Sequence, residues 1–280
     1  MKNNDCSILI NSCDKYSDVW DPFFSCFKEY YSDCPYKIYL NTETKNYSYK
    51  GFNIDIINSD VNVKWGKRFQ NSINKIDTEF IFVVLEDFFL EKAIVQEDIN
   101  KCIRVLKDNK NASVVYLVSD TDGLMKDNTG FAIIPEGTEY RLNSCPAIWR
   151  KSDLLKYVKK NDDPWAWEYF GTIRTEGKNK VFYCTPKDYP IYSYSYKTGG
   201  AIHKGKWVTS VMNPVNDKYN LSIDLAKRGV EMNTIHDTPS FWFNFKFLFK
   251  GIRMVGFKAF RFTIRANKKR LKRLLHLNEN

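Results

Sequence analysis

The sequence predicts an α/β fold with a mostly parallel sheet of the Rossmann type. Apolar stretches of strand length alternate with helix-like stretches from the amino terminus to Val118. Residues 80–85 (FIFVVL) are apolar without interruption, which is typical of a strand buried on both faces. The chain has 280 residues, 43% of them apolar, so it can bury the core that such a sheet needs. Alternation of this kind favours parallel strands joined by right-handed crossovers.

The first part of the chain shows a regular order of elements. Strands are predicted over residues 7–12, 36–40, 52–57, 80–85 and 113–118. Helices are predicted over residues 19–31, 65–76 and 98–107, where apolar side chains recur at helical spacing. This order predicts a nucleotide-binding half over about residues 1–120.

The regular order ends after Asp120, where a smaller acceptor-side half (about 121–240) is expected. A strand is predicted over residues 142–149, and a helix from Ser152 onward. The Tyr-rich residues 181–196 are predicted as short, partly exposed strands. Loops are predicted over residues 120–130 and 198–207, the latter with three glycines. We therefore expect one catalytic domain over residues 1–240, followed by a tail over residues 241–280.

Cysteine usage and hydropathy indicate the compartment. The seven cysteines are scattered without a CxxC pair, which favours reduced thiols over disulfides or a zinc site. No early stretch resembles a signal peptide, and no apolar run approaches the roughly 18 residues of a membrane-spanning helix. We therefore expect a cytoplasmic protein.

The basic residues are concentrated in the tail. The formal net charge is +10, and residues 246–280 hold eleven Lys and Arg against one acid. The residues before 246 therefore hold basic and acidic side chains in equal number. Aromatic and basic residues interleave from Phe241 onward, as in an amphipathic helix lying on an anionic membrane surface. A helix packed on the body, with a frayed basic end, is the alternative.

Glu86 and Asp87 follow the apolar run at the carboxyl end of its strand. Open α/β sheets place their ligands at this edge. A carboxylate there is costly unless a cation compensates it, and hard divalent ions prefer oxygen ligands. The alternatives are that one acid caps the next element or pairs with a buried base.

Residues 11–18 (NSCDKYSD) follow the first strand and are expected at the same edge of the sheet. Asn11, Ser12 and Asp14 carry polar groups that suit a base or a ribose. An ordinary loop is the alternative interpretation.

Lys67 and Arg68 begin the predicted helix at residues 65–76, and together with the adjacent Trp65 they are expected to bind the donor. Two positive charges near a helix N-terminus add to the helix dipole and suit a diphosphate. Solvated surface charges are the alternative.

Residues 162–172 (DDPWAWEYFGT) place a carboxylate among aromatic rings. Trp165 and Trp167 can stack on the apolar face of a sugar acceptor. Glu168 is then placed to act as a general base on an acceptor hydroxyl. The alternative is a core aromatic cluster with Glu168 exposed.

The glycine-rich residues 198–207 hold three further candidates. His203 is a possible third metal ligand beside Glu86 and Asp87, or a histidine without a site role. Lys204 and Lys206 are placed to close over phosphates.

Taken in order, these segments resemble bacterial glycosyltransferases of the GT-A fold, of the type that builds capsule or lipopolysaccharide O-chains. The matching segments are ILINSCDKYSDVWDPFF, CPYKIYLNTE, WGKRFQNSINKIDTEFIFVVLEDFFL, CPAIWRKSDL, DPWAWE and GGAIHKGKW. They extend over about residues 7–207, most of the body of the chain.

The resemblance implies a nucleotide-diphosphate sugar donor and a glycan or polyprenyl-linked lipid acceptor. It implies that Glu86 and Asp87 hold Mn²⁺ or Mg²⁺ on the donor diphosphate, although only two acids precede Phe88 where the family has a DXD-type motif. It also implies that Glu168 is the base of an inverting transfer. Such enzymes work at the inner face of the cytoplasmic membrane, which agrees with a basic aromatic tail.

Two other classes of function compete with this interpretation. A nucleotidyltransferase of similar fold would carry a glycine-rich, basic loop after the first strand, and this chain does not. A nucleic-acid-binding protein is suggested by the pI of about 9.1, but the body is neutral and no RNA-binding signature occurs. We therefore expect no nucleic-acid partner.

Overall fold

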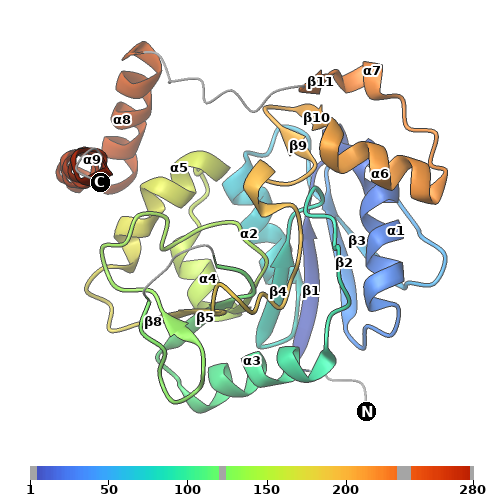
Figure 1. Cartoon of the computed structure of the whole chain (residues 1–280), viewed down its shortest axis with the longest axis horizontal. Coiled ribbons are helices and arrows are strands. Elements are labelled where there is room, and N and C mark those ends of the chain that lie inside the picture. The colour runs from blue at the N-terminus through green and yellow to red at the C-terminus, as the bar shows by residue number, and fades with distance from the viewer. Residues whose placement is uncertain (1–4, 120–123, 232–240, 278–280) are drawn as a thin grey trace.

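The computed structural model describes residues 5–119, 124–231 and 241–277. Eight strands form one sheet in the order β3-β2-β1-β4-β7-β5-β8-β6 (Figure 1). In chain order, these strands are β1 (Cys6–Asn11), β2 (Lys37–Thr42), β3 (Ile54–Asn58), β4 (Phe80–Val84), β5 (Ala112–Tyr116), β6 (Ala132–Ile133), β7 (Ala147–Arg150) and β8 (Val181–Cys184). All five strands expected in the first part of the chain are present, so the predicted α/β class is confirmed.

The sheet is mostly parallel. Strands β3, β2, β1 and β4 pair in parallel, as do β5 and β8. Strand β7 runs antiparallel between β4 and β5, and β6 runs antiparallel to β8. A strand was predicted over residues 142–149, but the strand found there, β7, is shorter and begins only at Ala147. Both halves of the expected catalytic domain contribute strands to this one sheet.

Helices cover both faces of the sheet. On one face lie α1 (Trp20–Tyr31) and α3 (Gln96–Asp108), and on the other lie α2 (Trp65–Lys75) and α4 (Lys151–Tyr157). Because side chains alternate along a strand, Ile8 and Ile10 of β1 pack in the first core, and Leu9 packs in the second. This two-sided burial explains why β1 and β4 are apolar at nearly every position.

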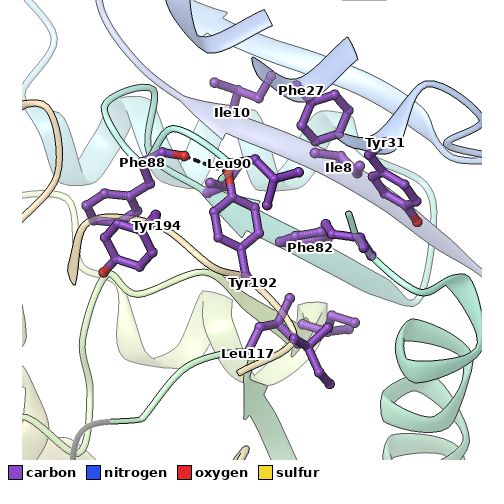
Figure 2. Packing of buried hydrophobic residues seen from close by; sticks show 14 of the residues in the cluster. Ile8, Ile10, Phe27, Tyr31, Phe82, Phe88, Leu90, Leu117, Tyr192 and Tyr194 are labelled. Atoms are coloured by element: carbon purple, nitrogen blue, oxygen red, sulfur yellow. Dashed lines mark hydrogen bonds between the residues drawn. The ribbon is translucent and has the colours of Figure 1, made fainter. Parts of the chain in front are cut away.

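The Tyr-rich residues 181–196 do not form partly exposed strands as predicted. Only β8 is a strand, and the chain after it passes over the end of β4. There Tyr192 is buried and its hydroxyl donates to the Phe88 carbonyl at 2.6 Å (Figure 2). The ring of Tyr194 packs on the ring of Phe88 with centroids 4.4 Å apart. These tyrosines therefore hold the segment that follows the acidic pair.

Residues 198–207 were predicted as a loop, but most of them form a hairpin. Strands β9 (Ile202–His203) and β10 (Lys206–Val208) pair antiparallel, and β11 (Val230–Glu231) joins β10 in a small second sheet. Lys204 and Gly205, both at positive φ (49° and 81°), make the two-residue turn, which is typical of tight hairpins. The hairpin is linked to β11 by α6 (Thr209–Tyr219) and α7 (Leu225–Arg228).

The tail forms two helices, α8 (Phe241–Val255) and α9 (Lys258–Leu277), which lie beside α5 (Pro164–Tyr169) (Figure 1). Ala259, Phe262 and Ala266 of α9 pack with Tyr169 and Phe170 in a third core. A Cβ atom at Gly251 of α8 would overlap the ring of Phe170, so a glycine is required at this contact. The tail is therefore helical and packs on the body by one face.

Other sequence expectations concern cysteines and membrane spans. All seven cysteines are free thiols. Among the residues that the structure describes, no helix is both long and apolar enough to cross a membrane. Part of the loop expected over residues 120–130 lies outside the described residues.

Candidate functional site

The acidic pair lies where β4 ends. Glu86 is only 6% exposed and Asp87 is partly buried. Within the described ranges, neither carboxyl group forms an ion pair. Burial, and then the charge of Asp87, raise the pKa of Glu86, while a hydrogen bond with the Ser12 hydroxyl lowers it. Burial also raises the pKa of Asp87, against the charge of Arg228. The site therefore holds buried acids whose negative charge is not neutralised by a direct partner.

The two residues that lead into the small hairpin, Gly200 and Ala201, lie directly against Asp87. The backbone N–H of Ala201 donates to the carbonyl oxygen of Asp87 at 2.8 Å. Gly200 has φ +103°, and a Cβ there would lie 2.7 Å from the same carbonyl oxygen and 3.2 Å from Asp87 Oδ2. Glycine is thus needed both for the backbone conformation and for the close approach.

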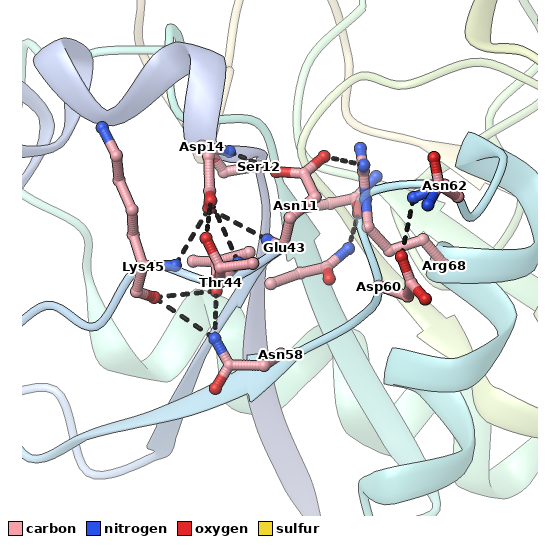
Figure 3. A network of polar contacts seen from close by, with 12 residues as sticks. Asn11, Ser12, Asp14, Glu43, Thr44, Lys45, Asn58, Asp60, Asn62 and Arg68 are labelled. Atoms are coloured by element: carbon pink, nitrogen blue, oxygen red, sulfur yellow. Dashed lines mark hydrogen bonds and ion pairs between the residues drawn. The ribbon is translucent and has the colours of Figure 1, made fainter.

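The loop after β1 is tied to the end of β2 (Figure 3). The Asp14 carboxylate accepts the backbone N–H groups of residues 43–45 at 3.0 to 3.3 Å and the Thr44 hydroxyl at 2.6 Å. Burial opposes the charged form, but these hydrogen bonds outweigh it and lower the pKa of Asp14. Asp14, expected to bind the donor, is therefore engaged in holding the loop.

Asn11 and Ser12 remain at the predicted edge. The Asn41 side-chain N–H donates to Asn11 Oδ1 at 2.7 Å, and the Trp20 indole donates to the Ser12 hydroxyl at 2.8 Å. Asn41 Oδ1 is buried without a partner in the described structure. A buried polar atom of this kind costs free energy unless a ligand or water satisfies it. This supports a polar ligand at the ends of β1 and β2.

Arg68 also lies at this edge but is engaged. Its guanidinium forms a largely buried ion pair with Glu43, which follows β2. Its Nε is buried without a partner in the part of the chain that the structure describes. Lys67, by contrast, is exposed on α2. Lys67 and Arg68 were expected to bind the diphosphate together. Instead, Arg68 is held in a buried ion pair and Lys67 lies on the surface.

Trp65, expected to bind the donor, packs instead within the fold. Its ring contacts the rings of Phe69 and Trp167, with centroids 5.2 and 5.7 Å away. The side chain is only partly exposed. Its main role in this structure is to join α2 to α5.

His203 does not complete a metal site with the acidic pair. Its Nδ1 lies 2.7 Å from Glu231 Oε2, across the small sheet. Among the described residues, no group of three or more His, Cys, Asp and Glu side chains is arranged to hold a metal ion. The prediction of a three-ligand set is wrong, because the hairpin turns His203 toward β11. Lys204 and Lys206 lie on the exposed side of the same hairpin.

Arg228 of α7 is a site residue that sequence reasoning missed. It forms an ion pair with Asp18, and its guanidinium lies 4.7 Å from the ring centroid of Tyr16 and 5.4 Å from that of Trp207. Its charge lowers the pKa of both Asp87 and Tyr16, so it faces the acidic pair. No local signal indicates this role, because its ion-pair partner Asp18 lies 210 residues away in the chain.

Glu168 lies on α5 with its Oε1 accepting the backbone N–H of Ser144 at 2.7 Å. Burial raises the pKa of Glu168, and the hydrogen bonds from Ser144 lower it. Trp165 is 68% exposed and free to contact an acceptor, whereas Trp167 is 2% exposed and packs on Trp65. Trp167 therefore cannot offer a ring face to a sugar, and that part of the prediction is wrong.

A short chain of contacts links Glu168 to the acidic pair. Ser144, which donates to Glu168, precedes Cys145, and the Tyr194 hydroxyl lies 4.0 Å from Cys145 Sγ. Tyr194 packs on Phe88, the residue after Asp87. Tyr194 therefore contacts a residue next to Ser144, which donates to Glu168, and the residue that follows Asp87.

The carboxylate oxygens of the acidic pair are the type of ligand that binds a divalent cation. Glu86 and Asp87 offer carboxylate oxygens in a buried setting that raises the pKa of both, and a bound cation would stabilise their charged forms. Such oxygens are the ligands that Mg²⁺ and Mn²⁺ prefer. Two carboxylates are too few to enclose the ion. Water and substrate phosphate oxygens would supply the remaining ligands, as is usual for Mg²⁺.

Comparisons with known proteins give a likeness of fold. No family model matches the chain, and no curated protein matches it. Among solved structures, S. aureus TarS 1–349 is 12% identical (TM-score 0.42), over 64% of this chain and 57% of that one. The bifunctional IspDF from Campylobacter jejuni is 13% identical (TM-score 0.39), over 68% and 52%. A cytidylyltransferase from Leptospira borgpetersenii is 11% identical (TM-score 0.43), over 83% and 99%.

The chain spans little more than half the length of the first two of these proteins. One further structure is S. aureus TarS 1–349 in complex with UDP-GlcNAc, 12% identical (TM-score 0.40) over 80% of this chain and 69% of that one. At such identities and TM-scores, the likenesses assign neither an activity nor a substrate to this chain.

Proposed function

We propose that this protein is a glycosyltransferase that moves a sugar from a nucleotide-diphosphate donor to a glycan or lipid-linked acceptor. The observation that carries the proposal is the Glu86–Asp87 pair, which is buried at the carboxyl edge of the sheet without an ion-pair partner in the described residues. Open α/β sheets bind their ligands at that edge. Surface polysaccharide synthesis of the capsule or O-chain type is the proposed pathway.

The donor would lie along the ends of β1, β2 and β4. Asn11, Ser12 and the unpartnered oxygen of Asn41 offer polar contacts to a base or ribose. Glu86 and Asp87 would hold Mn²⁺ or Mg²⁺ on the diphosphate, where the ion supplies stabilisation of the leaving group's charge. The charge of Arg228 lowers the pKa of Asp87 and so favours its charged form, against burial, before the donor arrives.

The acceptor would approach from the side of α5. Trp165 is exposed there, and the raised pKa of Glu168 makes its carboxylate a stronger base than an ordinary glutamate. In the proposed step, Glu168 takes the proton of an acceptor hydroxyl as its oxygen bonds to the anomeric carbon. The bond from that carbon to the diphosphate breaks, and its electron pair leaves with the nucleoside diphosphate. Attack opposite the leaving group gives inversion.

Nucleotidyl transfer by a similar fold is the second candidate. It releases pyrophosphate, so it requires positive charge in the loop after β1. In this chain that loop is fixed by the acids Asp14 and Glu43, and the nearby Arg68 is paired with Glu43. This arrangement favours glycosyl transfer.

The tail would place the enzyme on the inner face of the cytoplasmic membrane. One face of α8 and α9 packs on the body. The two helices and the turn between them also expose the large apolar residues Trp242, Phe243, Phe245, Phe249, Phe257, Phe260 and Ile264. Exposed aromatics flanked by basic residues are typical of helices in a membrane interface.

A thermal-shift series with nucleoside diphosphates, with and without Mn²⁺, tests the donor site. We expect one nucleoside diphosphate to raise the melting temperature, and Asp87→Asn to abolish that shift. Product analysis with the matching nucleotide sugar then separates the two candidates. Release of a nucleoside diphosphate supports glycosyl transfer, and formation of a nucleotide sugar from a triphosphate would contradict it.

A further inference from the structure

A cavity of about 690 Å³ lies between the start of α2, the loop joining α4 to α5, and α8. Its lining does not include Glu86, Asp87 or Glu168. The residues that line it are Lys64, Gln70, Lys159, Lys160, Asn161, Asp162, Arg174, Lys250, Arg253 and Met254. Six of these side chains are basic and one is acidic, so the cavity carries a surplus of positive charge.

The single acid of the lining is already engaged. Asp162 is buried, and its two oxygens accept from the Arg174 guanidinium at 2.5 and 2.8 Å. One of them also accepts the backbone N–H of Lys159 at 2.8 Å. Asp162 therefore neutralises Arg174 and fixes the loop. Lys64, Lys159, Lys160 and Arg253 remain to attract an anion.

The basic groups face one another across the cavity. Burial, and to a smaller extent the charge of Lys64, lower the pKa of Lys250, although Asp162 opposes them. Lys250 also pairs with Asp163 beside the cavity. Lys64 and Lys250 line the same cavity with four other basic side chains, and like charges disfavour one another unless an anion offsets them. This concentration of basic side chains favours an anion in the cavity.

A second, smaller cavity of about 380 Å³ shares Lys250 and Arg253 with the first. Its other lining residues are Phe245, Lys246 and Phe249 of α8. Phe245 and Phe249 are 55% and 51% exposed. The cationic cavity is therefore continuous with an exposed aromatic surface on the same helix.

We propose that the cationic cavity binds the phosphate of an anionic lipid headgroup, while the aromatic residues of α8 enter the interface around it. A free phosphate would use the basic cavity but would leave the adjoining aromatic surface without a role. A lipid uses both, because it joins a phosphate to apolar chains. This inference rests on the proposed membrane location and is independent of the proposed reaction.

The test compares two charge-matched double variants. Lys64→Gln with Arg253→Gln removes two exposed charges from the cavity lining. Lys75→Gln with Lys110→Gln removes two exposed charges from the ends of α2 and α3, away from the cavity lining. Co-sedimentation is measured with vesicles of phosphatidylcholine, with and without phosphatidylglycerol. We expect the full chain to bind only the vesicles with phosphatidylglycerol, the cavity variant to bind them at least about tenfold more weakly, and the control variant to lose much less.

Equal losses in the two variants would overturn the proposal, because they would show general attraction to charge. Undiminished binding by the cavity variant would overturn it as well. A third arm uses glycerol phosphate and inorganic phosphate in thermal-shift measurements. Stabilisation by these ions, with no preference of the protein for phosphatidylglycerol vesicles, would assign the cavity to a free phosphate and reject the lipid. A nucleoside-diphosphate shift without vesicle binding would reject this inference and leave the proposed reaction standing.

Discussion

Two regions of the molecule hold ionisable side chains that neighbouring residues do not fully neutralise: the acidic pair at the carboxyl end of β4 and the basic cavity beside α8. They differ in the sign of the charge and in how far the side chains are buried. At the first, Glu86 and Asp87 are removed from water, and the pKa of each is raised. At the second, most of the basic side chains reach solvent. Buried charge is costly and local in its effect, whereas exposed charge is tolerated and screened by salt. We therefore expect the first region to govern chemistry and the second to govern salt-dependent attachment.

The largest effect is expected at Asp87. Asp87→Asn keeps the shape of the side chain and removes one of the two negative charges under the hairpin. We expect sugar transfer to fall by about 10³-fold, because the diphosphate loses the charge that is preorganised to hold its cation. Turnover with a nucleotide sugar checks this, and Asp108→Asn, at an exposed acid in the last turn of α3, is the control. Unchanged turnover would show that the acidic pair is not part of the catalytic site.

A second large effect is expected at Glu168. Glu168→Gln should lower transfer by about 10²-fold or more, because a general base is lost, and should leave the nucleoside-diphosphate thermal shift intact. Since burial raises the pKa of Glu168, the acidic limb of the kcat/KM profile should lie above the ordinary glutamate value of about 4.3. Loss of nucleotide binding in this variant would instead assign Glu168 to the donor.

The comparison also shows which parts of the molecule the sequence predicts. Both charged regions could be recognised in the sequence. The acidic pair ends an apolar run, and in the tail aromatic residues are interleaved with basic ones. The elements of the first half were predicted because burial on two faces leaves a local pattern. Strand β7 was misplaced because its partners, β4 and β5, precede it by 30 residues or more, and its insertion between them depends on tertiary pairing.

The candidate site was predicted in its location and less well in its partners. Glu86 and Asp87 lie at the expected edge, since the position of a strand's carboxyl end follows from the alternation of elements. Arg228 was missed, and His203 was placed in the wrong set, because their positions depend on tertiary contacts of the hairpin, with Trp207 and with Glu231 respectively. Sequence spacing carries no information on contacts between residues so far apart.

A moderate effect on stability is expected where the tail meets the body. Gly251→Leu would force a side chain into the ring of Phe170, and overpacking of this kind costs about 1–3 kcal/mol. Asn244→Leu, on the exposed face of α8, is the matched control. Limited proteolysis within residues 241–277 should accelerate in the first variant and not in the second. Equal protection in both would mean that the tail does not depend on this contact.

The last prediction concerns pH and tests the burial of the acidic pair directly. A carboxyl group whose folded pKa is raised binds more protons in the folded than in the unfolded protein, so stability falls as pH rises from the unfolded pKa through the folded pKa. Glu86→Gln removes this titration. The variant should therefore melt at a higher temperature than the parent near neutral pH. The difference should disappear below the unfolded value of about 4.3. Melting curves across this range, measured without divalent ions, check the prediction, and a variant less stable at neutral pH would show that the Glu86 charge is balanced in the folded protein.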